Sequence, residues 1–456
     1  MSSISTNIDQ FDRAYFIGVG GIGMSALARY FNSKGWIVGG YDKTNTHLTN
    51  QLESEGIEIH YRDLGSDIPT QFHDVTKTLV IYTPAIPTDF GELTHVQRYK
   101  YTVKKRAEVL GMITRNSKAI GVAGTHGKTT TSTMLAHLLN ESKLKCNAFL
   151  GGIGTNFQSN FVSGDSELTV VEADEFDRSF LQLSPFASIV TSTDADHLDI
   201  YGSNDCFLDG FKEYVKRIHS DGFLVRHSSV GISHENEVTY GFDSSADYTG
   251  LNPRFLDGRF LIDVDTPDGI WKEVELGIPG LHNAENAIAC IALCIGLGLG
   301  EDVIRYGLKT FSGVKRRFEY QIRSDELTYI DDYAHHPTEI SALVSSVRLL
   351  YPNQKITGVF QPHLFSRTRD FFDEFASELS RLDEVVLLPI YPAREEPLPG
   401  ITSEALLQKI EGLEKRLVSP PEAVRYLSTK SSGVFLTIGA GDIDRIVPHL
   451  KKVLTE

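Results

Sequence analysis

A lysine and three threonines follow a glycine-rich turn in the segment Ser117–Leu139. The segment predicts a buried strand, a turn and a helix, the order of the phosphate loops that hold nucleoside triphosphates. Gly124 and Gly127 would let the backbone approach phosphate oxygens. Lys128 would then meet the β- and γ-phosphates, and the Thr129 hydroxyl would meet magnesium. The first glycine of the common GxxxxGK(S/T) pattern is missing, so this is a variant loop, with a plain strand-turn-helix connection as the alternative.

Carboxylates and a histidine follow the next two predicted strands. Four acids, Glu172, Asp174, Glu175 and Asp177, follow the strand SELTVV. The strand ASIVTST is followed by Asp194, Asp196, His197 and Asp199. Because parallel strands end at one edge of a sheet, these side chains should face the phosphate loop. Magnesium prefers oxygen ligands and leans on substrate phosphates, and a histidine ligand indicates a second metal. The sequence therefore predicts a site for Mg²⁺, or Mn²⁺, formed by Thr129, Glu172 and His197; a solvated acidic loop is the alternative.

A second glycine signature precedes the first by about a hundred residues. Gly18, Gly20 and Gly23 fit GxGxxG within a predicted strand-turn-helix-strand unit, and Asp42 ends its second strand. Alone, this motif would suggest a dinucleotide-binding oxidoreductase. What it secures physically is a turn for a diphosphate at the start of a helix, which a sugar nucleotide could also use. Two such turns in one chain imply two nucleotides.

Length and element order predict three α/β domains with parallel sheets. The chain has 456 residues, and the order strand, loop, helix repeats in each third. We place the domains at 1–113, 114–313 and 314–456. The first two would carry the diphosphate turn and the triphosphate turn respectively.

Charge and cysteine use narrow the class of protein. Sixty acidic and 44 basic residues give a net charge of −16, which argues against nucleic acids and anionic membranes as partners. The four cysteines show no CxxC spacing, so neither zinc nor a disulfide framework is indicated. The N-terminus lacks the features of a secretory signal, and the apolar stretch 287–300 is too short to span a bilayer. We expect a cytoplasmic enzyme of small molecules.

Over essentially its whole length the sequence resembles the Mur ligases of bacterial cell-wall synthesis. The resemblance is carried by the ordered stretches FIGVGGIGMSALA, GTHGKTTT, VEADEFDRSF, DADHLDIYG, GIPGLHNAENAIA, KRRFEY, DDYAHHPTEI, FQPHLFSRTRD, YPAREEPLPG and GAGDI. It implies a Rossmann-like N-terminal domain, a central P-loop ATPase domain and a Rossmann-like C-terminal domain. It also implies an ATP-dependent ligase that joins UDP-N-acetylmuramate to L-alanine through an acyl phosphate, as a monomer or weak homodimer.

The resemblance also assigns roles to residues of this chain. For the sugar nucleotide it implies the first turn and its acid: Gly18, Gly20, Gly21, Ile22, Gly23 and Asp42. For ATP it implies the second turn and several later residues: Gly124, Thr125, His126, Gly127, Lys128, Thr129, Thr130, His282, Asn283, Asn286, Arg316 and Asp332. For the amino acid it implies Tyr333, His335 and Arg367. The catalytic set would be Lys128, Glu172, His197, His335 and Arg367.

The sequence departs from the family pattern at Leu364. Most alanine-adding relatives have a basic residue there, so the choice of L-alanine over glycine or L-serine is open. Several Mur ligases also carry a carbamylated lysine, and Lys212 and Lys216 lie in roughly that region without a spacing that selects either. A dehydrogenase, a sister ligase that attaches a whole peptide, and a non-enzymatic nucleotide-binding regulator remain as alternatives.

Overall fold

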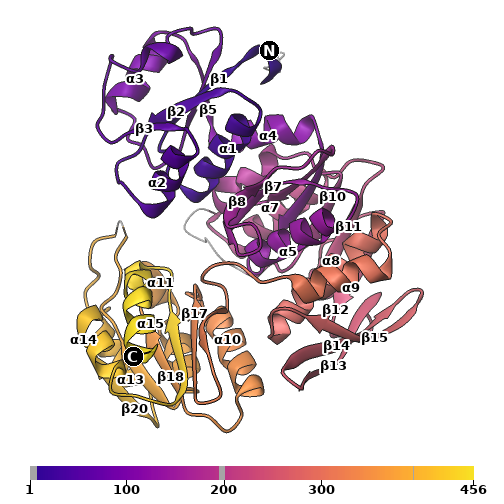
Figure 1. Ribbon diagram of the computed structural model, residues 1–456, viewed down its shortest axis with the longest axis vertical. Coiled ribbons are helices and arrows are strands. Elements are labelled where there is room, and N and C mark those ends of the chain that lie inside the picture. Colours follow the sequence, from indigo (N-terminus) through magenta and orange to yellow (C-terminus); the bar gives the residue numbers. More distant parts are fainter. Residues whose placement is uncertain (1–7, 195–200, 394, 456) are drawn as a thin grey trace. The chain divides into compact units, whose positions relative to one another are not determined.

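The computed structural model describes residues 8–194, 201–393 and 395–455. Three sheets, one in each third of the chain, confirm the predicted three-domain α/β fold (Figure 1). Two compact units divide the chain at Gly313, except that the short segments 253–261 and 276–284 belong to the second unit. The N-terminal and central domains thus share the first unit. The domain limits stay predictions, and the one placed at 113 falls inside α4 (Arg106–Arg115).

The N-terminal domain is a five-stranded parallel sheet in the order β3-β2-β1-β4-β5. Buried apolar residues alternate along β1, so that Ala14 and Phe16 face the core under α1 while Tyr15 and Ile17 face the core under α3. The two helices therefore cover opposite faces. The elements are β1 (Arg13–Ile17), α1 (Ile22–Ser33), β2 (Ile37–Tyr41), α2 (His47–Ser54), β3 (Glu58–His60), β4 (Thr78–Tyr82), α3 (Gly91–Arg98) and β5 (Thr102–Lys105).

The central domain is built on a ten-stranded sheet in the order β15-β14-β13-β12-β11-β10-β6-β9-β7-β8. Strands from β12 to β7 in this order run parallel, and β8 is antiparallel to β7. The glycine turn follows β6, so it opens between β9 and β10, whose ends carry the predicted acids. The elements are β6 (Lys118–Ala123), α5 (Lys128–Glu141), β7 (Asn147–Gly154), β8 (Ser159–Val162), β9 (Leu168–Glu172), η3 (Phe176–Gln182), β10 (Ala187–Val190), α7 (Asn204–Val215), β11 (Phe223–His227), β12 (Glu237–Gly241), β13 (Tyr248–Leu256), β14 (Arg259–Thr266), β15 (Gly269–Leu276), α8 (Leu281–Gly296) and α9 (Glu301–Thr310).

The C-terminal domain is a six-stranded sheet in the order β16-β17-β21-β18-β19-β20, in which only β16 is antiparallel to its neighbour. One core lies under α10, α12 and α13, and a second lies under α14 and α15, so both faces are covered. The elements are β16 (Glu319–Arg323), β17 (Leu327–Asp332), α10 (Pro337–Leu350), β18 (Ile356–Phe360), α11 (Phe365–Asp370), α12 (Phe372–Leu379), β19 (Glu384–Leu387), α13 (Ser403–Lys409), β20 (Glu414–Leu417), α14 (Pro420–Leu427), β21 (Gly433–Ile438) and α15 (Val447–Thr455).

Helix α1 of the N-terminal domain packs on β7 and β8 of the central domain. Its Tyr30 ring lies 5.3 Å from the Phe149 ring, and the buried Asn160 amide donates to the Ile22 carbonyl and to Ser25 Oγ. Arg29 donates to Asn160 Oδ1 and also pairs with Glu55 at 2.7 Å. This polar contact explains why the two domains form one compact unit.

Among the described residues, none of the helices has the length and apolar character needed to cross a bilayer.

Candidate active site

The turn after β6 has the backbone of a phosphate loop. Gly124 and Gly127 take φ values of +131° and +80°, which L side chains rarely adopt, and a Cβ on Gly124 would lie 2.1 Å from Thr191 Oγ1. Helix α5 begins immediately after Gly127, so its first N–H groups and positive end face the turn.

Lys128 is bonded back onto this turn. Its Nζ donates to the Gly124 carbonyl at 2.6 Å and to Glu175 Oε1 at 2.8 Å. Burial by itself would lower the pKa of Lys128, but the carboxylates of Glu175, Asp174 and Glu172 raise it, so the lysine is cationic. Burial raises the pKa of Glu175 to about 7, although Lys128 opposes the rise. The second oxygen of Glu175 is buried without a hydrogen-bond partner among the described residues.

The rest of the turn is held by the end of β10. Thr125 Oγ1 donates to the Asp194 carbonyl at 2.7 Å, and the His126 N–H donates to Ser192 Oγ at 3.0 Å. Thr130 is buried in the first turn of α5. Asn286 lies beside the turn, since a Cβ on Gly127 would be 2.8 Å from Asn286 Oδ1.

Two of the three predicted metal ligands are in contact. The Thr129 hydroxyl donates to Glu172 Oε2 at 2.9 Å, at the start of α5 and the end of β9. His197, with the neighbouring acids after Asp194, lies outside the described residues. Among the residues that are described, no three His, Cys, Asp or Glu side chains gather closely enough to hold a metal. Two oxygen donors beside Lys128 fit an ion such as Mg²⁺, which completes its shell with phosphate oxygens and water.

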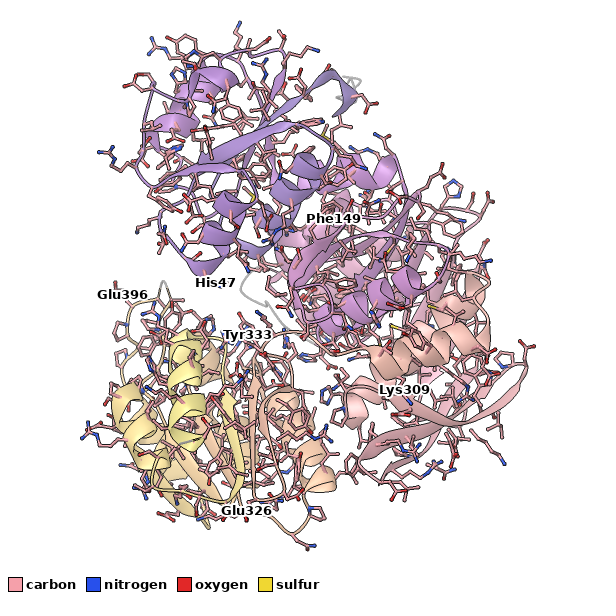
Figure 2. The ribbon with its side chains drawn as sticks, in the orientation of Figure 1. His47, Phe149, Lys309, Glu326, Tyr333 and Glu396 are labelled. Carbon is pink, nitrogen blue, oxygen red and sulfur yellow. The ribbon has the colours of Figure 1, made fainter. Side chains whose placement is uncertain are left out.

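The glycine turn after β1 opens onto a cavity of about 290 Å³. Gly21 and Gly23 line it on one side, and Phe149, Gly151, Glu172 and Asp174 line it from the central domain. Phe149, labelled in Figure 2, comes from β7. The cavity therefore joins the first glycine turn to the predicted metal ligand Glu172.

Asp42 holds the first turn rather than facing the cavity. Its Oδ2 accepts the Gly20 N–H at 2.7 Å, and its Oδ1 accepts the Thr44 N–H at 3.1 Å. One amide of the predicted diphosphate turn is thus bonded within the protein. Gly18 has φ +94°, and a Cβ there would lie 2.6 Å from Thr83 Cγ2, so this position requires glycine.

Two of the predicted ATP residues, His282 and Asn283, belong to the second compact unit, whereas Asn286 belongs to the first. His282 lies with its ring 6.3 Å from that of Phe318, and the buried Asn283 amide donates to the Pro279 carbonyl at 2.6 Å. Lys212, considered for carbamylation, is exposed and pairs with Asp209 at 2.8 Å, and Lys216 is an exposed residue at the end of α7.

Within the second unit, Arg316 and Asp332 organise the end of β17. Arg316 donates to the Gly439 carbonyl at 2.7 Å and lies 5.0 Å from the Tyr333 ring, which Figure 2 labels. Asp332 accepts the N–H groups of Phe318 and Ala334 at 2.7 and 2.8 Å. Burial raises the pKa of Asp332 to about 6. Its oxygens are thus bonded to backbone here, not presented outward.

A histidine pair lies beside Arg367. The rings of His335 and His363 are 6.0 Å apart, and His363 stacks on Tyr391. Burial lowers the pKa of His335, and burial, His335 and Arg367 together lower the pKa of His363 to about 4. Both imidazoles are therefore neutral near pH 7. Leu364, between His363 and α11, has φ +69° and ψ +138°, a strained backbone conformation for a leucine.

Sequence reasoning missed several of these residues. Glu175 was noticed as an acid but given no role, and His363, Tyr391 and Arg106 were not considered. Arg106 is the first residue of α4, and its Nη2 lies 3.7 Å from Asp174 Oδ2 in the cavity wall. The positions of these side chains depend on tertiary packing, so no local spacing could have found them.

Known protein families match this chain in each of its three domains. Family models described as Mur ligase family, catalytic domain, Mur ligase middle domain, and Mur ligase, glutamate ligase domain match residues 13–118, 122–294 and 316–441. Curated UDP-N-acetylmuramate–L-alanine ligases are similar over nearly the full length: one from Flavobacterium johnsoniae is 48% identical over 99% of both chains. One from Porphyromonas gingivalis is 50% identical over 97% of this chain and 99% of its own.

Solved structures agree. The UDP-N-acetylmuramate–alanine ligase of Thermotoga maritima matches with a TM-score of 0.83 and 30% identity, over 96% of this chain and 98% of that one. A murein peptide ligase from Psychrobacter arcticus, 22% identical with a TM-score of 0.70, shares the fold over 97% of this chain and 98% of its own. Mur ligase family models match all three domains, and curated Mur ligases are 48% and 50% identical to the chain over nearly its full length. The chain therefore belongs to the Mur ligase family.

Proposed function

We propose that this chain joins L-alanine to the lactyl carboxylate of UDP-N-acetylmuramate and converts ATP to ADP and phosphate in doing so. The products would be UDP-N-acetylmuramoyl-L-alanine, ADP and phosphate, in the synthesis of peptidoglycan precursors. The observation that carries the proposal is the sequence identity of 48% and 50%, over nearly the full length, to curated UDP-N-acetylmuramate–L-alanine ligases. The N-terminal domain would hold the sugar nucleotide, the central domain ATP, and the C-terminal domain the amino acid.

The chemistry requires an activated carboxylate. A carboxylate oxygen attacks the γ-phosphorus of ATP, and the bond between that phosphorus and the oxygen bridging to the β-phosphorus breaks. ADP departs, and the carboxylate has become an acyl phosphate. The neutral amine of L-alanine then attacks the acyl carbon, and the tetrahedral intermediate collapses with loss of phosphate and of the amine proton. Lys128 supplies fixed positive charge where the phosphoryl group gains negative charge. The cavity wall that runs from the first glycine turn to Glu172 supports placing the carboxylate near this turn.

Thr129 and Glu172 would hold Mg²⁺, which when bound neutralises charge on the phosphates. His197 stays a proposed third ligand. In the C-terminal domain, Arg367 would bind the alanine carboxylate as a planar fork. The neutral His335 and Tyr333 would line the same site.

The test is phosphate release from ATP with UDP-N-acetylmuramate and Mg²⁺, comparing L-alanine, glycine, L-serine and a tripeptide, with NADH oxidation followed in parallel. Release that needs both the sugar nucleotide and L-alanine is expected. Equal release with glycine or L-serine would show that the pocket around Leu364 does not select alanine. Release with the tripeptide alone, or NADH oxidation without release, would overturn the proposal.

A further inference from the structure

Arg106 lies where a cation needs an anion. A Cβ on Gly23 would be 2.9 Å from both Cδ and Nη1 of Arg106, so its guanidinium rests against the first turn of α1. The N-terminus of a helix carries partial positive charge, and a cation placed there is unfavourable by itself. The Arg106 side chain is 27% exposed. A negative partner on the cavity side would therefore stabilise its placement.

The partner that the protein provides is a weak one. Asp174 Oδ2 lies 3.7 Å from Arg106 Nη2, which is beyond hydrogen-bond length. A guanidinium has five N–H donors in a fixed fork, and none makes a hydrogen bond to a described residue. Arg106 itself lines the cavity that the turn opens onto. Its donors are thus available to a planar or tetrahedral anion.

The charges around the cavity select which anion can enter. Arg106 is the one cation among the described residues that line it, whereas Glu172 and Asp174 add two carboxylates. A diphosphate brings further negative charge, so its binding against these acids depends on a cation beside the turn. Building on the proposed function, we propose that Arg106 binds the diphosphate of the sugar nucleotide, exchanging its ion pair with Asp174 for that group.

This role also explains the third glycine of the turn. Gly23 has ordinary helical backbone, so conformation alone does not require glycine there. The absence of a Cβ instead leaves room for the guanidinium, which would have to shift away from the turn if a Cβ were added. The glycine therefore serves the close approach of Arg106.

The test is calorimetric titration of UDP and of UDP-N-acetylmuramate into wild type, Arg106→Met, Arg106→Lys and Gly23→Ala. Arg106→Met should weaken both ligands by about 10- to 100-fold, the worth of a charged hydrogen-bonded pair. The affinity of Arg106→Lys for both ligands should lie between those of wild type and Arg106→Met, because lysine keeps the charge but lacks the planar fork of N–H donors. Gly23→Ala should weaken both ligands with the arginine still present. KM for ATP should not move.

Arg115→Met at the exposed far end of α4 is the matched control and should bind both ligands as wild type does. Unchanged binding of UDP to a folded Arg106→Met protein would overturn the proposal. So would a loss confined to UDP-N-acetylmuramate, which would mean that Arg106 binds the lactyl carboxylate. If wild type bound UDP-N-acetylmuramate without alanine-dependent phosphate release, the proposed function would fail while Arg106 was still tested.

Discussion

The two glycine turns of this chain have the same order of strand, turn and helix, but they acquire positive charge differently. The turn after β6 contains its own cation, since Lys128 lies four residues after Gly124 and is bonded back to it. The turn after β1 has none in its sequence, and Arg106 reaches it from a helix more than eighty residues later. The turn after β6 thus has its cation within its own sequence motif. The turn after β1 gains a neighbouring cation only when the domain folds and brings α4 beside it.

Removing the built-in cation should have the largest effect. Lys128→Met should lower kcat for phosphate release by about 10²- to 10³-fold, because a fixed donor to transition-state charge is lost. Lys143→Met, an exposed lysine just after the same helix, is the control and should leave kcat unchanged. Since the substitution leaves Glu175 buried without its partner, Lys128→Met with Glu175→Gln separates catalysis from folding. A double variant with wild-type kcat would show that Lys128 does not stabilise the transition state, and the contrast between the two turns would then not hold.

Loosening the contact between the domains should harm the first turn more than the second. Asn160→Ala removes the buried amide that bonds to Ile22 and Ser25 of α1. Stability should fall by about 1–3 kcal/mol, the cost of stranding such partners. KM for the sugar nucleotide should rise more than KM for ATP. Steady-state kinetics and urea unfolding measure both, with exposed Ser163→Ala as the control. Equal changes in the two KM values would count against separate dependence on α1.

Glycines of the first turn should differ among themselves. Gly18→Ala places a side chain at φ +94° and 2.6 Å from Thr83, and should cost about 1–3 kcal/mol in the free energy of unfolding. Gly21 has φ −66°, and a Cβ there would lie 3.7 Å from Met24 Cγ, an ordinary contact distance. Gly21→Ala should therefore change the free energy of unfolding by less than about 0.5 kcal/mol. Urea unfolding distinguishes them. Equal costs would show that the turn is not shaped as described.

The smallest effect on turnover is expected in the C-terminal domain, at the start of β19. Burial would raise the pKa of Glu384, but hydrogen bonds from Tyr426, Lys430 and Lys355 outweigh it and lower the pKa to about 2. A glutamate in the unfolded chain titrates near about 4.3. The stabilisation is thus present above that pH and is lost as pH falls toward the folded pKa.

Glu384→Gln should therefore lower Tm at neutral pH, and its difference from wild type should shrink as the medium is acidified below about pH 4.3. Activity at neutral pH should persist. Differential scanning calorimetry across pH provides the check, with exposed Glu404→Gln as the control. A Tm difference that stays constant on acidification would mean that Glu384 is not held as its anion.

The same contrast explains what the sequence could predict. Lys128, Thr129 and Glu172 could be predicted as site residues because a phosphate loop and the strand beside it are local patterns, and the structure places Thr129 against Glu172. The three-domain fold followed from the repeated order of strands and helices. Asp42 stays a predicted sugar-nucleotide residue, and the structure adds that it accepts the Gly20 N–H. Its orientation depends on how the turn closes, which spacing does not encode.

The contact between Asn160 and α1 has a practical consequence for inhibitor chemistry. Because it fastens α1 to the central sheet, the two glycine turns, which we propose bind anions, belong to one compact unit. A bisubstrate compound that carries a diphosphate at one end and a phosphate mimic at the other would meet both turns at once. Its linker would best be stiff, since a preorganised ligand loses less conformational entropy on binding.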